Sequence, residues 1–432
     1  MAWGELLLLV LSFAVLLAVG VPVAFAIGVS TTLTMLASMD AGPAVTTVAQ
    51  RMATGLDSFT LLAVPFFILA GQLMNRGGIA RRLIDLAKAL VGSLPGGLAH
   101  VNVVAAMFFA AISGSSVATA SAIGGVMGPR MEAEGYDRDF SAAVNISAAT
   151  TGLIIPPSNI LIIYSLASGG VSIAALFLAG YVPGLIVGLA LMAVAAWISR
   201  REGYATSERV GPGQVVRRLI DAVPSLFLLV VVIGGIAAGI FTATEAAAVA
   251  VLYALVLSLL YGEIRPAGLP RVLLETAETT AIVMLLIATS MAMSWILAYL
   301  NIPQGVSAAL VALSDQPVVV LLIINVVLLA VGTVIDITPA VLIFTPIFLP
   351  VAVGLGIDPV HFGIVMILNL CIGLCTPPVG SVLFVGVAVA RTTVPRVVRP
   401  LLPFYVAMIV ALLLVTYVPA LTLWLPRLFG TI

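Results

Sequence analysis

Long apolar segments dominate this chain, and their lengths predict an all-helical protein that crosses a membrane many times. A helix needs about 20 predominantly apolar residues to cross the hydrocarbon core of a bilayer. Segments near this length recur along the whole sequence, separated by short polar loops. We expect about ten transmembrane spans, at residues 4–20, 21–38, 59–75, 139–168, 171–198, 219–240, 244–261, 272–298, 360–390 and 400–425.

Two further apolar stretches, 98–130 and 318–352, are too long for one upright span and divide in the middle at small or polar residues. The first divides at Ser113-Gly114-Ser115-Ser116 and the second at Gly332-Thr333 and Asp336. Each arm has about 15 residues, a helix of about 22 Å, whereas the hydrocarbon core is about 30 Å thick. The pattern therefore predicts two re-entrant helical hairpins that return to the side from which they enter.

Two Pro-Pro steps lie inside apolar segments in the two halves of the chain, at 156–157 and 377–378. Consecutive prolines remove amide donors and interrupt a helix, and hydrocarbon tolerates this only where the freed backbone is buried in protein or lines a cavity. The offset between the two steps also aligns Pro129 with Pro350, Gly135 with Gly356, Asp137 with Asp358, Gly152 with Gly373, and Ser115 with Asp336. We expect one unit used twice, with a broken helix at 139–168 and another at 360–390. Broken helices at matching places in two halves are typical of a transporter's binding site.

Composition and charge placement support a membrane protein built from inverted halves. The chain is 62% hydrophobic and 8% charged, and its net charge of zero gives no reason to expect a nucleic-acid partner. If both hairpins return to their own side, all of the 18 Lys and Arg residues except Arg51 and Arg427 fall on one side, the predicted cytoplasm. The first hairpin then enters from the cytoplasm and the second from outside. We expect a first half at 1–199, a cytoplasmic linker at 200–217 and an inverted second half at 218–432.

Segment 78–94 has apolar residues at helical spacing with basic residues between them, which favours an amphipathic helix on the cytoplasmic surface. The alternative is an ordinary solvated loop.

Several polar residues in apolar regions are interpreted as structural. Thr242 and Glu245 have the spacing of a capping box at a helix start, the alternative being an ion ligand. His100 and His361 have no acidic or cysteine partner at a spacing that would indicate a catalytic or metal site. Cys371 and Cys375 lie four residues apart on one helix face, as packing residues do.

The candidate chemistry lies at the two polar tips and the two proline breaks. The tip Ser113-Gly114-Ser115-Ser116 leaves unpaired backbone groups near the midplane, and the break at 155–159 starts a new half-helix at Ser158 and Asn159. Free carbonyls suit a small hard cation, whereas half-helix N-termini present positive dipole ends to an anion. Sodium and an anionic substrate are therefore expected.

The second half repeats this arrangement with a tip at 332–336 and a break at 375–380. A charged Asp336 would cost about 2.5 kcal/mol or more at the bilayer centre, so we expect it to face a cavity or an ion. The alternative is a hydrogen-bonded structural carboxylate.

Two other classes of function compete with a transporter. An intramembrane hydrolase could use Ser113, Ser115 or Ser116 with His100, but the Gly-x-Ser-x-Gly elbow is absent there. A hydrolase would also leave the duplicated breaks unexplained. A channel is the other class, and saturable, concentrative uptake would exclude it.

Several motifs resemble the large membrane subunit of tripartite ATP-independent periplasmic (TRAP) transporters, over essentially the whole chain. They are Ser113-Gly114-Ser115-Ser116, Ile155-Pro156-Pro157-Ser158, the segment 239–248, and the segments 356–363 and 369–380, the last two being the most specific. Ala243 stands where the family pattern has proline, which affects only a helix start.

The resemblance implies an elevator-type DctM-like permease of the bacterial cytoplasmic (inner) membrane, without enzymatic activity or an organic cofactor. It implies sodium-coupled uptake of a small organic anion, such as a C4-dicarboxylate, keto acid or sugar acid. It also implies two partners, a small four-helix membrane subunit and a periplasmic solute-binding protein. The alternative is a stand-alone sodium and divalent-anion symporter of similar architecture.

The resemblance also assigns residues to ions and substrate. Sodium would be held in one half at Ser113, Ser115, Ser116, Pro156, Pro157 and Ser158, and in the other at Gly332, Thr333, Asp336, Thr376, Pro377 and Gly380. Substrate contacts are expected at Gly114, Ser115, Asn159, Thr333, Val379 and Gly380.

Overall fold

The computed structural model describes residues 3–204, 212–314 and 316–432, and in these residues every regular element is a helix. The elements before residue 205 are α1 (Trp3–Ala18), α2 (Val23–Ser38), α3 (Ala41–Leu56), η1 (Phe59–Leu62), α4 (Ala63–Arg76), α5 (Ile79–Val91), α6 (Gly97–Ser113), α7 (Ser116–Ala133), α8 (Arg138–Thr151), α9 (Asn159–Ala167) and α10 (Ile173–Glu202). Those that follow are α11 (Pro212–Ala237), α12 (Ala243–Leu260), η2 (Pro266–Gly268), α13 (Leu269–Tyr299), α14 (Ile302–Leu313), α15 (Pro317–Gly332), α16 (Ile337–Gly354), α17 (Pro359–Leu374), α18 (Ser381–Val389), α19 (Val394–Tyr417) and α20 (Ala420–Leu428). The predicted all-helical fold is confirmed.

The two hairpins and the two broken helices are present and follow one another in the same order in both parts of the chain. Helices α6 and α7 form the first hairpin, and α15 and α16 form the second. Each is followed by a helix that stops at a Pro-Pro step and a short helix that resumes after it, α8 with α9 and α17 with α18. The offset that relates the Pro-Pro steps also relates the starts of α8 and α17, and those of α10 and α19. Both Pro-Pro peptide bonds are cis.

Seven helical segments in the described residues are long and apolar enough to cross a membrane, by length and composition. They are η1 with α4, α10, α11, α12, η2 with α13, α16 and α19. Five further apolar helices, α1, α2, α6, α15 and α17, have between 10 and 17 residues. Two helices, α3 and α14, were not predicted, and the predicted span 400–425 divides near Val418 into α19 and α20. Part of the predicted linker, 205–211, lies outside the described residues, so the division into halves stays a prediction.

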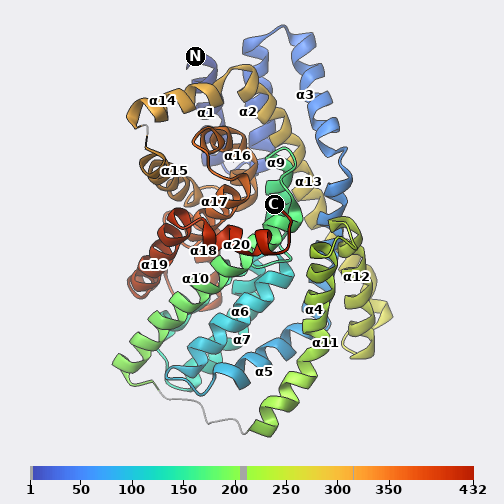
Figure 1. The fold of residues 1–432 in the computed structure, drawn as a ribbon, viewed down its shortest axis with the longest axis vertical. Helices are drawn as coiled ribbons and strands as arrows, with labels where there is room; N and C mark the ends of the chain where they lie inside the picture. The colour runs from blue at the N-terminus through green and yellow to red at the C-terminus, as the bar shows by residue number, and fades with distance from the viewer. Residues whose placement is uncertain (1–2, 205–211, 315) are drawn as a thin grey trace.

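The helices group into two bodies, which we name by their contents. In the scaffold body, α4 packs against α12, while α1, α2, α3 and α13 pack together and α11 lies against α12. In the hairpin body, α6 to α10 pack with α15 to α20. Helices α5 and α14 join the bodies, because α5 contacts both α6 and α11 and α14 contacts both α16 and α13. Figure 1 shows α3, α4, α12 and α13 on the right and α15, α17, α18 and α19 on the left.

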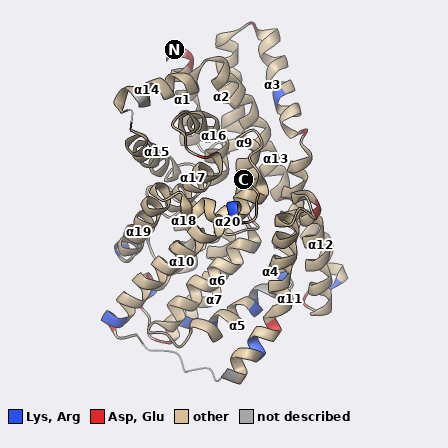
Figure 2. Ribbon diagram, in the orientation of Figure 1, with Lys and Arg blue, Asp and Glu red and all other residues tan. Residues whose placement is uncertain are grey.

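Basic residues gather at one end of the molecule. Figure 2 places those of α5 and of the facing ends of α10 and α11 at the lower end, whereas the basic residue of α3 lies in the upper part. The first hairpin lies in the lower half of Figure 1 and the second in the upper half. The hairpins therefore approach one another from opposite ends, and the basic end is the one that the positive-inside rule assigns to the cytoplasm.

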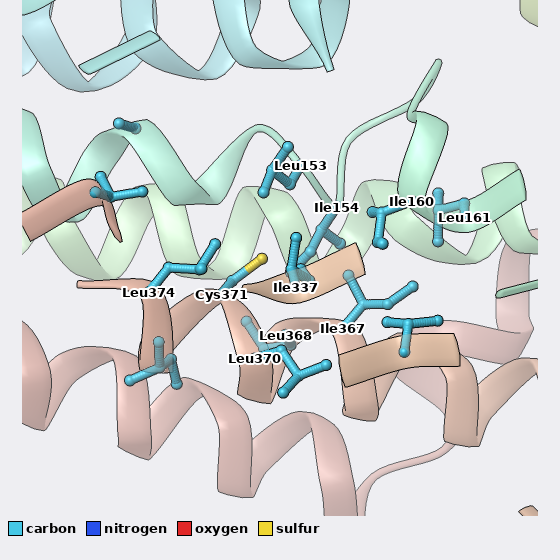
Figure 3. Close-up of a cluster of buried hydrophobic side chains, with 14 of the residues drawn as sticks. Leu153, Ile154, Ile160, Leu161, Ile337, Ile367, Leu368, Leu370, Cys371 and Leu374 are labelled. Carbon is cyan, nitrogen blue, oxygen red and sulfur yellow. The ribbon is translucent and has the colours of Figure 1, made fainter. Parts of the chain in front are cut away.

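The hairpin body has one continuous apolar core that holds its two repeated parts together. In the first part, Leu153 and Ile154, beside the first break, are almost fully buried. Figure 3 shows them close to Ile337 of α16 and to Cys371 and Leu374 of α17. Helix α16 also packs against α9, and α18 packs against α7. Each hairpin is thus held by the broken helix of the other part of the chain as well as by its own.

Candidate functional site

A cavity of about 310 Å³ lies where the tips of the two hairpins meet the scaffold body. It is lined by Ser113 to Ala118 of the first hairpin, by Asn159, Ile160 and Ile163 of α9, and by Asp336, Ile337 and Thr338 of the second hairpin. Helices α4 and α13 close the opposite wall, and Leu153 completes the lining. The tips of two hairpins from different halves of the sequence thus contribute to one cavity.

The serine tip is built by local hydrogen bonds. Ser115 is the N-cap of α7, and its Oγ accepts a hydrogen bond from the Ala118 amide at 3.2 Å. Its carbonyl accepts one from the Thr119 hydroxyl at 2.7 Å. Gly114 has a φ of 63°, and a Cβ added there would lie 2.8 Å from Nδ2 of Asn159. Only glycine therefore lets the tip turn and lie directly against the start of α9.

The first break holds its serine away from the cavity and presents its asparagine to it. Ser158 is fully buried, and its hydroxyl donates to the Leu153 carbonyl. Pro156, Pro157 and Ser158 do not line the cavity. Asn159 does line it, and its buried Oδ1 has no hydrogen-bond partner within the residues described. A buried polar atom without a partner is uncommon and calls for a ligand or an ordered water.

The second tip and the second break are joined through the backbone. The Thr333 carbonyl accepts hydrogen bonds from the amides of Val379, at 3.1 Å, and Gly380, at 3.0 Å. Gly332 lies so close to Gly373 that a Cβ on Gly373 would be 2.5 Å from backbone atoms of Gly332. The predicted residues Gly332, Thr333, Val379 and Gly380 are therefore brought together, although none of them lines the cavity.

Oxygen atoms gather at this second tip and break, from the Asp336 carboxylate and from the backbone around Gly380. Asp336 lines the cavity, and its carboxylate accepts a hydrogen bond from the Ser381 hydroxyl at 3.1 Å. Around Gly380, which has φ 29° and ψ 89°, the carbonyl oxygens of Leu374 and Thr376 would lie within 2.9 Å of an added Cβ. Carbonyl oxygens that converge on a backbone without side chains suit a small hard cation. Thr376 and Pro377 belong to this same segment and do not line the cavity.

Sequence reasoning missed the cavity wall that the scaffold body supplies. Gln72 and Asn75 of α4 and Thr279 of α13 line the cavity, as does Thr338 of α16. Gln72 and Asn75 are three residues apart and share a helix face. Two polar residues on one face of an otherwise apolar span were the signal that could have found them.

The polar residues interpreted as structural have structural partners. Thr242 and Glu245 form the predicted capping box of α12. Nε2 of His361 donates to the Thr416 carbonyl at 3.1 Å, and Nε2 of His100 donates to the Pro95 carbonyl at 3.0 Å. Both cysteines are free and buried. Helix α5 forms as predicted, and its Leu83 and Leu86 are almost fully buried.

Comparison with known protein families identifies the chain. Residues 10–421 match the model of the family described as tripartite ATP-independent periplasmic transporter, DctM component. This match covers both hairpins, both breaks and the cavity. It confirms the resemblance seen in the motifs.

Two of three curated relatives carry the name of this family, and the third is uncharacterised. The chain is 54% identical to the uncharacterised protein YgiK of Salmonella typhimurium, over 97% of this chain and 96% of that protein. It is 42% identical to the C4-dicarboxylate TRAP transporter large permease DctM of Pseudomonas aeruginosa (87% of this chain, 88% of that one). The identity is also 42% to the sialic acid TRAP transporter large permease SiaM of Vibrio cholerae (88% and 89%).

The crystal structure of the YdaH transporter of Alcanivorax borkumensis, described as having an unusual topology, has the same fold. It superposes with a TM-score of 0.63 over 87% of this chain and 88% of that one, at 14% sequence identity. Multiple apolar helices and these bacterial relatives place the protein in the cytoplasmic membrane as a multi-pass protein. The chain belongs to the DctM family, the large permease component of tripartite ATP-independent periplasmic transporters.

Proposed function

We propose that this permease takes up a small organic anion with sodium, and that the anion binds in the cavity between the hairpin tips. The observation that carries the proposal is the convergence of three helix N-termini on this cavity. The first residues of α7, α9 and α16 all line it. Each N-terminus carries a partial charge of about +0.5 and presents free amides, a combination that attracts anions.

The charge balance of the cavity favours joint binding of anion and cation. Among the described residues that line it, Asp336 is the only one with a charged side chain. Three helix ends supply about +1.5 charges against one carboxylate, so a dicarboxylate would leave the site negative. Bound sodium would restore neutrality. The affinity for the anion would therefore depend on the sodium concentration.

Sodium would be held by hydroxyl and carbonyl oxygens beside the two breaks. For the first half we propose Ser113, Ser115, Ser116, Pro156, Pro157 and Ser158, and for the second Gly332, Thr333, Asp336, Thr376, Pro377 and Gly380. The unpartnered Oδ1 of Asn159 and the carbonyls that converge on Gly380 support oxygen coordination near both breaks. Substrate contacts are proposed at Gly114, Ser115 and Asn159, which line the cavity, and at Thr333, Val379 and Gly380, which lie outside its lining and would reach the anion only after a movement of the second tip.

Transport would proceed by sliding of the hairpin body against the scaffold body. Within the described residues, no side-chain hydrogen bond or ion pair joins the two bodies directly. Their contacts run through α13 with α16, α4 with α6 and α9, η1 with α9, and α10 with α11. A contact without directional side-chain bonds can shift without breaking hydrogen bonds between the two bodies.

The family suggests two partners, a small membrane subunit and a periplasmic binding protein. Because the C4-dicarboxylate and sialic acid permeases are about equally similar to this chain, we infer that the binding protein selects the anion. Candidate anions are C4-dicarboxylates, keto acids and sugar acids.

Reconstitution in liposomes tests the proposal. The permease, its small subunit and a ligand-loaded binding protein should give saturable, concentrative uptake under an inward sodium gradient. Uptake that persists when choline replaces sodium would remove the sodium claim. Uptake without the soluble protein would favour a stand-alone symporter, and flux that neither saturates nor concentrates would indicate a channel.

A further inference from the structure

A second cavity, of about 460 Å³, lies between α5 and α7 on the arginine-rich side of the first. Its lining comprises Asn75, Arg81, Ile84, Asp85, Phe109, Ala122, Ile123, Val126 and Arg130. Asn75 also lines the cavity at the hairpin tips. The two cavities thus share a lining residue, and the second lies on the side assigned to the cytoplasm.

The charges around this second cavity differ from those of the first. Arg81 of α5 and Arg130 of α7 both line it, and neither has an ion pair within the part of the chain described. The one acid in the described lining, Asp85, is bound by Arg218 at 3.0 Å. Arg81 also lines a neighbouring pocket with Asp221 and Glu263, whereas Arg130 does not. The second cavity therefore contains positive charge that is not neutralised by an ion pair in the described residues and could attract an anion, mainly at Arg130.

We propose that Arg130, with Arg81, forms an anion station on the release route, which receives the substrate after it leaves the hairpin tips. This inference rests on the proposed function for the identity of its anion. The described lining of the first cavity contains no arginine or lysine, so a carboxylate that loses sodium there would lose part of its neutralising charge. A guanidinium group on the release route lowers the barrier to release, because it attracts the anion without enclosing it in a binding site.

The reactivity of a cysteine at Val126 tests this station without knowledge of the substrate. Val126 lines the second cavity and is 53% exposed, whereas Cys371 and Cys375 are buried. The probes are two membrane-impermeant methanethiosulfonates of opposite charge, a sulfonate and a trimethylammonium, applied to the full-length Val126→Cys permease. A unit charge about 10 Å away in water changes each rate about twofold, so Arg130→Gln should lower the ratio of anionic to cationic rates about fourfold.

Control substitutions distinguish the effect of Arg130 on the two reaction rates from the effect of general surface charge. Arg201 is exposed on the same side and does not line the cavity, so Arg201→Gln should leave the ratio unchanged, and Arg130→Lys should preserve it. Inside-out vesicles should react faster than right-side-out vesicles. An unchanged ratio in Arg130→Gln, or faster reaction from the periplasmic side, would overturn the inference. Failure of the proposed function would appear in the liposome uptake assay and would not alter this ratio.

Discussion

Asp336 shows how the two repeats diverge at a single position. The offset between the repeats aligns it with Ser115, but Ser115 caps α7 whereas Asp336 makes no side-chain capping bond to α16. Asp336 instead lines the cavity, and its carboxylate accepts a hydrogen bond from Ser381. Because no other described residue of that lining is charged, the two tips differ in charge and cannot bind the same ion equally.

Replacement of Asp336 by asparagine should weaken sodium binding. The change keeps the shape of the side chain but removes the charge that faces the ion. We expect the half-saturating sodium concentration for uptake, or for thermal stabilisation of the purified permease, to rise at least tenfold, about 1.4 kcal/mol. Glu245→Gln, which keeps a residue type that fits a capping box, is the matched control. An unaltered sodium dependence in Asp336→Asn would refute the assignment.

Position 373, at the second break, has room only for glycine. A Cβ there would lie 2.5 Å from the backbone of Gly332, which has no side chain that could move aside. Gly373→Ala should therefore separate α15 from α17 and destabilise the protein by about 1–3 kcal/mol, measured by thermal unfolding in detergent. Gly125→Ala is the control, because nothing lies within 4 Å of its added Cβ and alanine favours the helix. Equal melting temperatures for the two variants would contradict this account.

At the scale of elements, the sequence predicts the interruptions of the apolar runs and the amphipathic helix α5, but its hydropathy pattern does not reveal α3 and α14. The hairpins and breaks were predictable because proline and clustered small residues interrupt apolar runs, which hydrocarbon rarely tolerates. Helix α3 was missed because Gln50 and Arg51 lower its apolar character. Helix α14 could have been found from α5, since the repeat offset that carries Pro156 to Pro377 also carries 79–91 to 300–312. The repeat thus contained more information than the hydropathy pattern alone.

The capping box of α12 is an element whose local energetics can be tested. The Thr242 hydroxyl accepts a hydrogen bond from the Glu245 amide at 3.3 Å, and Glu245 Oε2 accepts one from the Thr242 amide at 2.8 Å. Thr242→Ala should lower the free energy of unfolding by about 1 kcal/mol, whereas Thr242→Ser should preserve it. Thermal unfolding of both variants in the same detergent provides the measurement. Equal loss in both would show that the methyl group, and not the cap, is responsible.

At the scale of the whole molecule, the composition of the cavity was the part that sequence could not supply. Ser113 to Ser116, Asn159 and Asp336 were expected at functional positions, but which of them share one space depends on how the repeats pack. The opposing wall comes from α4 and α13, whose Gln72 and Thr279 carry no motif. Pairwise packing between distant helices sets these neighbours, and a single sequence does not encode it in local patterns.

Sliding of the hairpin body against the scaffold body predicts that one cross-link stops transport and another does not. Val283 of α13 and Thr338 of α16 line the same cavity from opposite bodies. A short bismaleimide that joins Val283→Cys to Thr338→Cys should abolish uptake, because the two helices could no longer move past each other. Because both residues line the proposed binding cavity, the uptake of the linked variant is compared with that of each single-cysteine variant after the same treatment, and only the additional loss is assigned to the cross-link.

The matched control is a cross-link inside the hairpin body. Glu132 and Arg138 form an ion pair of 2.9 Å between α7 and the start of α8, so Glu132→Cys and Arg138→Cys can be joined by the same reagent. If the hairpin body moves as one unit, this link should leave uptake near its original rate. Loss of uptake in both linked variants would mean that the hairpin moves relative to its own broken helix. Retained uptake in the Val283 and Thr338 pair would rule out sliding at this interface, since α13 and α16 would then stay in place while the substrate crosses.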